Sequence, residues 1–497
     1  MATIRCMDGT DFVAFVLIVA AAAGARVWYL SAAGESTNTY DSIRVQDVFA
    51  EAKPGERFEG PSSRGESAPT ELDILVANLI NRDQFACRPA FAKVTEDVVH
   101  VSPGYPYFLS VLERLRSNSL RADVLARWIQ VGFGAVTAGL YYLTALIAFR
   151  SRAVGLLAGV FCALHPFWIV NSMAIGDGTL ATFLLALAIF LGTRAGLAGG
   201  PLTSLLFGLS LAVLALVRAA LLPFAFVCLL WLLLRCRGLP AGWMCGLLSV
   251  LGFVIGLAPW CMRNWQTFQE PVPIVNSAYH HLWMGNNPRA TGGPMSEADM
   301  VSALDALPGS NLGRRLADAH SQTERYGILG QATLDSVRDD PAGCVRRRTW
   351  AGLDFFFGQQ FINQPVATGE GLLGASSTFE SLPAWVGSNP GLIFYASTFG
   401  MLLFGVLGWR WTYAWRRESR LLALAAIFVP LPYILSHAEA LVGPRLPLDG
   451  VLLTFAAYAL ACMVPGVGWR LSQGPEPIEG EEATVRRSDE DIRHARL

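Results

Sequence analysis

Charge is scarce in this sequence. Of its 497 residues, 15% are charged and 53% are hydrophobic, whereas soluble domains carry about a quarter charged residues. The formal net charge is -1, so the chain has no basic excess with which to bind the phosphates of a nucleic acid. The composition therefore predicts an integral membrane protein and excludes a nucleic-acid-binding one.

Metal-binding and redox motifs are missing as well. None of the nine cysteines belongs to a CxxC pair or a His-Cys cluster, so spacing alone predicts no metal site, although it does not exclude a divalent ion. Cys87 and Cys344 lie in long polar stretches, where a disulfide between them is one open alternative in an oxidising compartment. The cysteines inside apolar runs are expected to be small packing residues: Cys162, Cys228, Cys245 and Cys462.

Long apolar runs dominate what is present. A helix needs about 20 apolar residues to cross the hydrocarbon core of a bilayer, and about ten segments fit that template. We predict an all-α polytopic membrane protein with about ten transmembrane helices, formed by one domain over residues 1–465. The expected crossings are 12–30, 124–148, 154–171, 179–193, 203–217, 219–234, 241–259, 391–409, 421–436 and 447–464.

Two long polar stretches interrupt these runs, at about 31–121 and 261–389. Arginines gather in the short links instead, above all between the crossings at 391–409 and 421–436, and cationic links are typical of the cytoplasmic side. Both long stretches are therefore predicted to be extracytoplasmic loops with short interfacial helices at about 322–337 and 350–357. Both termini are predicted to be cytoplasmic, with a disordered tail at 466–497.

A few ionisable groups lie on the predicted outer side, in the first long loop or next to the ends of crossings, where charge near the bilayer is costly and often functional. Taken singly, each has a structural interpretation as a solvated charge, a turn residue, a helix cap or an interfacial anchor. Together, carboxylates and arginines on one face suit an anionic lipid phosphate and the deprotonation of an acceptor. The set comprises Asp41, Glu71, Asp73, Asp177, Arg263 and Arg445. Arg218, between two apolar runs, fits neither side of the predicted topology.

Several longer motifs resemble those of bacterial C-type glycosyltransferases, and more narrowly the branch related to protein O-mannosyltransferases and lipid A aminoarabinose transferases. The likeness runs from the first crossing to the last. The motifs that carry it are SPGYPYFLS, ALHPFWIVNSMAIGDGTLATFLL, LAPWCMRNWQTFQEPVPIV and HLWMGNNPRATGG. Hydropathy alone does not require any of them.

The resemblance implies an inverting transfer of a sugar from a polyprenyl-phosphate donor to an extracytoplasmic glycan, lipid or protein acceptor, in the inner membrane of a cell. It implies that Glu71 is the catalytic base, with Asp73 and Asp41 as competitors, and that Asp177 orients the acceptor or a cationic partner. Arg445, with Arg263 as a second contact, would bind the lipid phosphate, because a guanidinium holds two phosphate oxygens and stays charged. No cofactor is implied.

Two other interpretations remain open at this stage. A secondary transporter has similar hydropathy, but the chain shows no repeat that relates its two halves, and its two long polar stretches are untypical of that class. A catalytically inactive relative that binds a polyprenyl lipid is the second alternative, because the residues around Glu71 depart from the family pattern. The sequence also lacks a glycine-rich phosphate-binding loop, as expected if the donor is a lipid rather than a nucleotide.

Overall fold

The computed structural model describes most of the chain, and the statements below concern that part. The described residues are 8–33, 71–92, 95–115, 122–236, 242–293, 295–307, 311–357, 390–412, 417–437 and 444–467. They are mostly helical, which confirms the all-α class. Their only sheet is a two-stranded antiparallel ribbon of β1 (Ala86–Cys87) and β2 (Glu96–Asp97). The predicted tail at 466–497 lies almost wholly outside the described residues.

Five of the described helices are long and apolar enough to cross a membrane, which supports the prediction of a membrane protein. The number of crossings predicted from the sequence, about ten, is not confirmed. The five are α1 (Gly9–Ala33), α5 (Ala122–Phe149), α8 (Gly178–Ala198), α11 (Gly242–Phe268) and α23 (Leu446–Met463). The most enclosed of them is α23, with 15 of its 18 residues buried, and it packs against α8 and two further helices, α6 (Arg152–Ala163) and α20 (Pro390–Thr412).

Two predicted crossings are broken rather than continuous. The segment at 154–171 divides into α6 and α7 (Pro166–Asn171). The segment at 421–436 divides into α21 (Arg420–Phe428) and α22 (Leu431–Leu435). In each case proline stands at the break, where it cannot donate a backbone hydrogen bond and its ring collides with the preceding turn. The remaining apolar helices are α9 (Pro201–Val217) and α10 (Leu222–Arg235), joined by the 3-10 turn η2 (Ala219–Leu221), and a second 3-10 turn, η4 (Arg417–Ser419), precedes α21.

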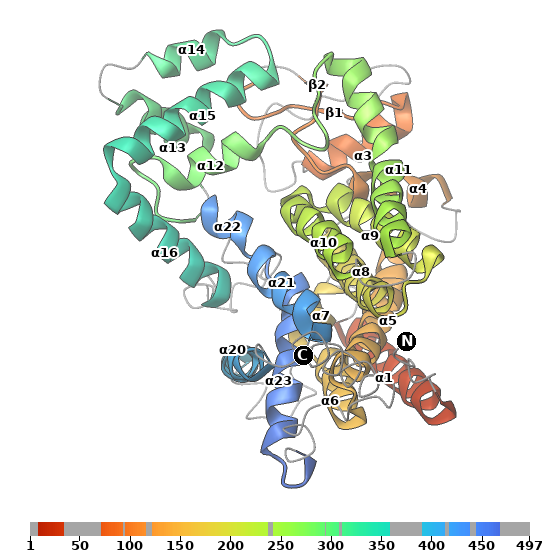
Figure 1. The fold of residues 1–497 in the computed structure, drawn as a ribbon. Coiled ribbons are helices and arrows are strands. Elements are labelled where there is room, and N and C mark those ends of the chain that lie inside the picture. Colours follow the sequence, from red (N-terminus) through yellow and green to blue (C-terminus); the bar gives the residue numbers. More distant parts are fainter. Residues whose placement is uncertain are drawn as a thin grey trace, which may run out of the picture.

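Helices α9 and α11 approach each other closely because glycine faces the contact from both sides. A Cβ atom on Gly208 of α9 would lie 1.8 Å from the backbone oxygen of Ser249, and one on Gly252 of α11 would lie 2.2 Å from that of Leu205. Small residues at such a contact let helix backbones pack directly, which is how helices associate where no hydrophobic effect drives them together. The pair forms one wall beneath the polar end of the molecule (Figure 1).

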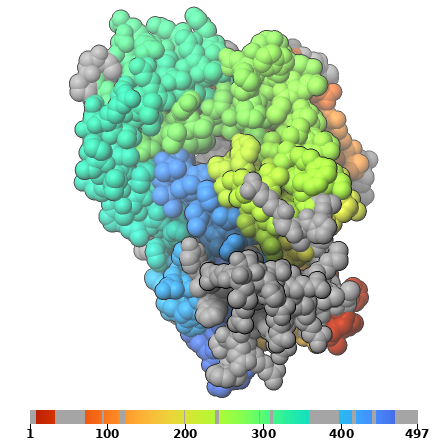
Figure 2. Space-filling model, in the orientation of Figure 1, coloured from red at the N-terminus to blue at the C-terminus, as the bar shows by residue number. Residues whose placement is uncertain are grey.

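The polar end is a cap of short helices and the β-ribbon, and we call it the polar cap: residues 71–115 and 270–357 as described. Figure 1 shows it above the apolar bundle, and Figure 2 shows α12 to α16 covering that end of the molecule. Predicted helices at 322–337 and around Trp350 are confirmed as α15 and α16. Its helices are α3 (Glu71–Arg82), α4 (Gly104–Leu115), α12 (Ala278–Asn286), α13 (Glu297–Asp305), α14 (Leu312–Asp318), α15 (Gln322–Asp339) and α16 (Pro341–Phe357).

The motifs that carried the family resemblance hold the cap to the bundle. Trp260 donates from its indole nitrogen to the Ile274 oxygen at 2.8 Å, and Asn264 donates to Val272 at 2.9 Å. In the motif HLWMGNNPRATGG, Asn286 donates to the Leu435 oxygen at 3.0 Å. Polar side chains that satisfy buried backbone groups in this way fix where α11, α12 and α22 meet.

Candidate functional site

A cavity of about 700 Å³ lies where the polar cap meets the apolar bundle. Val217 at the end of α9 and Gly176 before α8 line it from the bundle, while α3, α4 and α12 line it from the cap. A cavity of this size suits a small ligand or one end of a larger one. Its ionisable lining residues are Glu71, Arg88, His100, Asp177, His280, His281 and Glu297.

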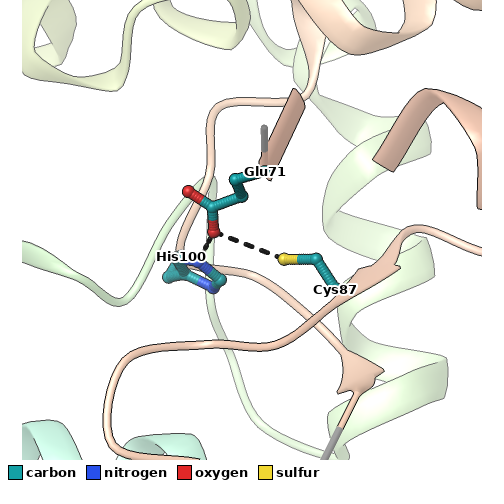
Figure 3. A group of neighbouring side chains, drawn as sticks. All are labelled: Glu71, Cys87 and His100. Atoms are coloured by element: carbon teal, nitrogen blue, oxygen red, sulfur yellow. Dashed lines mark hydrogen bonds and ion pairs between the residues drawn. The ribbon is translucent and has the colours of Figure 1, made fainter. Parts of the chain in front are cut away.

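Glu71 is the first residue of α3, and two side chains bond to the same oxygen of its carboxylate. His100, just after β2, places Nε2 at 2.5 Å from Glu71 Oε1. Cys87 on β1 donates its thiol to that oxygen at 3.3 Å. Figure 3 shows the three side chains converging from the helix, the strand and the turn after the ribbon. The other carboxylate oxygen, Oε2, has no hydrogen bond among the described residues.

The electrostatics of the cluster keep Glu71 ionised. Desolvation raises the pKa of Glu71, but the hydrogen bond and charge of His100, with the hydrogen bond from Cys87, outweigh it, so the pKa lies below its ordinary value. Burial, with the adjacent Glu71 carboxylate, raises the pKa of the Cys87 thiol. Half of the Glu71 side chain is exposed, so a carboxylate that can accept a proton faces the cavity at neutral pH.

Asp177 lines the cavity at the start of the bundle helix α8 and binds Arg218 through both carboxylate oxygens. Arg218 Nε and Nη2 donate to Asp177 at 2.7 and 2.6 Å. Asp177 occupies the N-cap position of α8, as the helix-cap interpretation expects, but its side chain makes no capping hydrogen bond and binds Arg218 instead. The pair also accounts for Arg218, which the predicted topology left unexplained: it is a buried cation neutralised by a fixed partner.

Histidines gather on the cap side of the cavity. Of the seven histidines in the chain, His100, His280 and His281 line it, and His281 Nδ1 lies 3.0 Å from Nε2 of His437, which follows α22. The pKa of His280 is lowered to about 3, mainly by burial and then by the neighbouring His281, His100 and His437. His280 Nε2 is buried and has no hydrogen-bond partner in the described part of the chain. With their pKa values lowered in this way, His280, His281 and His437 are neutral at physiological pH.

Arg263 and Arg445, the predicted lipid-phosphate contacts, are not among the lining residues. Arg263 donates to the backbone oxygens of Val98 and Phe85 at 3.0 and 3.2 Å, which anchors the β-ribbon to α11.

Arg445 is buried in the bundle. Its Nε lies 2.9 Å from Asp449 Oδ1, and Asp449 Oδ2 lies 3.0 Å from His165 Nε2. Arg445 Nη1 donates to the backbone oxygen of Phe356. Both guanidinium groups are thus already held by protein partners.

The remaining candidates lie elsewhere. Asp73 is buried on α3 and is absent from the cavity lining, and Asp41 lies outside the described residues. Cys87 and Cys344 are both free thiols. Cys87 is bonded to Glu71 and Cys344 lies 3.3 Å from Asn286 Oδ1, so the possible disulfide between them is not formed.

Sequence reasoning thus found Glu71 and Asp177 but missed their partners. The partners are distant in sequence from the carboxylates that they contact: 29 residues for His100, 16 for Cys87 and 41 for Arg218. No local sequence spacing therefore predicts them. Arg88, an exposed cation on the cavity wall, was missed for the same reason. Comparison with protein-family models finds no match, and no curated protein matches the chain.

Proposed function

We propose that this protein is a membrane glycosyltransferase that moves a sugar from a polyprenyl-phosphate donor to a hydroxyl acceptor, with Glu71 as the catalytic base. The observation that carries the proposal is the ionised Glu71 carboxylate in the cavity, which bonds to described residues through one of its two oxygens. A fixed carboxylate with one unoccupied oxygen is suited to take a proton from a substrate held beside it.

The position of the cavity supports a lipid-linked donor. It lies at the junction of apolar helices and polar cap, the depth at which the phosphate of a polyprenyl chain would emerge from the hydrocarbon. Arg88 is the exposed cation on its wall, and arginine can hold two phosphate oxygens. We assign the phosphate contact to Arg88 in preference to Arg263 and Arg445, whose guanidinium groups are committed to protein partners.

The reaction is a single displacement. The acceptor oxygen forms a bond to the anomeric carbon while its proton passes to Glu71 Oε2. The bond from that carbon to the phosphate oxygen breaks, and its electron pair leaves with the polyprenyl phosphate, which Arg88 stabilises. The Asp177 and Arg218 pair forms a rigid polar wall on the opposite side, against which the acceptor is oriented.

The proposed topology places the polar cap outside the cytoplasm of a cell's inner membrane, with about ten crossings and both termini inside. Arg150 and Arg152 lie at the link between α5 and α6. Figure 1 shows α6 at the end of the bundle away from the polar cap, which agrees with a cytoplasmic position for that link.

The test is transfer of labelled sugar from polyprenyl-phosphate donors by membranes that contain the protein. We expect Glu71→Gln to lower transfer by at least about 100-fold. Asp73→Asn should lower it far less, because Asp73 does not line the cavity. Glu324→Gln is the matched control: Glu324 is exposed in the cap and accepts a backbone hydrogen bond from His320, which glutamine can replace.

Full transfer by Glu71→Gln at matched abundance would reject Glu71 as the base. If the wild-type protein transfers no sugar from any donor in a broad panel, the enzymatic proposal fails and a lipid-binding or transport role takes its place.

A further inference from the structure

The three side chains of the Glu71 cluster are of types that bind metal ions as well as forming hydrogen bonds with one another. Glu71, Cys87 and His100 each offer one metal-binding atom, and these atoms lie within 4.8 Å of one another. The ligand atoms in a tetrahedral zinc site are about 3.3 to 3.8 Å apart. The pairs at 2.5 and 3.3 Å therefore need to move by only about an ångström to surround one ion.

The backbone holds these three positions firmly. Cys87 pairs with Glu96 in the β-ribbon, α3 packs on β1, and the segment after β2 is tied to α12, where Ser277 donates to the His100 oxygen at 2.8 Å. Three ligands delivered by separate but connected elements form a preorganised site rather than a chance meeting of surface side chains.

A fourth group faces the same cavity. His280 on α12 lines it and carries a buried Nε2 with no hydrogen-bond partner among the described residues. Its ring stacks on Tyr326 at 5.8 Å between centroids, and the Tyr326 hydroxyl is likewise buried without a described partner. Polar atoms left unpaired at one place indicate that something polar binds among them.

The ligand types select the metal. One thiolate, one imidazole and one carboxylate match zinc, whereas Mg²⁺ and Ca²⁺ prefer oxygen ligands throughout. We propose that Glu71, Cys87 and His100 bind one Zn²⁺ ion, with the fourth coordination position open to the cavity. This set is not apparent from the sequence, because it combines residues from α3, β1 and the turn after β2.

An open fourth position has a chemical consequence. Catalytic zinc sites keep three protein ligands and one exchangeable position, where the metal lowers the pKa of a bound hydroxyl. An acceptor hydroxyl bound there would pass its proton to Glu71 Oε2, because only Oε1 binds the ion. The same hydroxyl would form a hydrogen bond with His280. This catalytic role rests on the proposed function, whereas zinc binding itself does not.

The experiment measures metal content in the full-length chain, purified in detergent without a polyhistidine tag and equilibrated with zinc. We expect about one zinc ion per chain, and at least about tenfold weaker binding in Cys87→Ser and His100→Asn. Cys344→Ser is the matched control, because Cys344 is a half-buried thiol bonded to Asn286 away from the cavity, and it should bind zinc as the wild type does.

Cobalt provides a second measurement, because Co²⁺ bound to a thiolate gives a charge-transfer absorption band. The band should appear in the wild type and in Cys344→Ser, and it should vanish in Cys87→Ser that elutes as a folded protein. Equal zinc affinity of the wild type and Cys87→Ser, or the absence of the thiolate band, would reject the proposed zinc site. Zinc binding would then have to come from the other histidines. Zinc bound at this site without sugar transfer would reject the proposed function alone, and transfer by a metal-free chain would reject the catalytic role of zinc.

Discussion

Single residues in this protein take their roles from partners that are distant in the sequence. Asp177 illustrates the point, because glycines on both sides favour a turn, whereas its carboxylate holds a buried arginine from the end of α9. Glu71 likewise depends on His100 and Cys87. In each case the residue type indicated that charge matters, and only the folded chain showed which side chains the carboxylate contacts.

We expect Asp177→Asn to destabilise the protein by about 1 to 3 kcal/mol, because it leaves the buried Arg218 guanidinium without its counter-charge. Thermal unfolding in detergent measures the effect. The control is Asp335→Asn, an exposed carboxylate whose contact with Arg338 spans 3.9 Å, and it should change stability by less than about 0.5 kcal/mol. Equal unfolding midpoints for the two variants would show that the Asp177 pair is not a stabilising contact.

His437, which contacts His281 of the polar cap, is expected to make the stability of the protein sensitive to acid. Its pKa is lowered from 6.5 to about 3, mainly by burial and then by the nearby His281 and Arg348. Below about pH 6.5 this histidine is protonated in the unfolded chain but stays neutral in the folded protein. The free energy of unfolding therefore falls as the pH falls from 6.5 toward 3, by at most about 1.4 kcal/mol per pH unit.

Unfolding midpoints measured from pH 7 to pH 4.5 test this, with His437→Gln as the comparison. The variant should lose less stability over that range than the wild type. Parallel curves for the two proteins would contradict a neutral, buried His437.

At the scale of elements, hydropathy locates the apolar segments but not their breaks or contacts. The helices at 12–30, 124–148 and 447–464 were predicted nearly to their ends, whereas the segments at 154–171 and 421–436 each divide at proline. Proline inside an apolar run is tolerated in some membrane helices and breaks others, and the outcome depends on neighbouring helices. The close approach of α9 and α11 depends on which glycines face each other, which no single segment reveals.

Gly208→Ala is expected to destabilise the α9 and α11 pair by about 1 to 3 kcal/mol, because its Cβ would overlap the Ser249 oxygen at 1.8 Å and force the helices apart. Gly132→Ala in α5 is the matched control: no atom lies within 4 Å of its added Cβ, so helix propensity should leave stability unchanged or raise it by about 0.5 to 1 kcal/mol. Thermal unfolding compares them. A neutral Gly208→Ala would mean that the helices are not in direct backbone contact.

At the scale of the whole molecule, composition was sufficient to predict an all-α membrane protein, because low charge and long apolar runs leave few alternatives. The site was predicted in part. Glu71 and Asp177 do line one cavity. Arg263 instead anchors the β-ribbon to α11, and Arg445 lies within the bundle beside Asp449. Their interfacial positions alone do not distinguish a ligand contact from an internal ion pair, because both satisfy a costly charge near the membrane.

The proposed orientation predicts opposite accessibility for two introduced cysteines. Asp335→Cys in the cap should react with a membrane-impermeant maleimide in spheroplasts, whereas Arg150→Cys, at the link between α5 and α6, should react only after the membrane is opened. Labelling of both from the same side would contradict the topology. The background removes the other accessible or undescribed thiols: Cys6, Cys261, Cys344 and Cys462.

The enclosure of α23 has a consequence for biogenesis. This helix is synthesised after α6, α8 and α20, yet it fills the space among them and brings Asp449 to His165. A ribosome-bound chain that has not yet produced α23 must hold His165 in the membrane without its carboxylate partner. The bundle therefore reaches its final packing only when the last of these helices leaves the translocon.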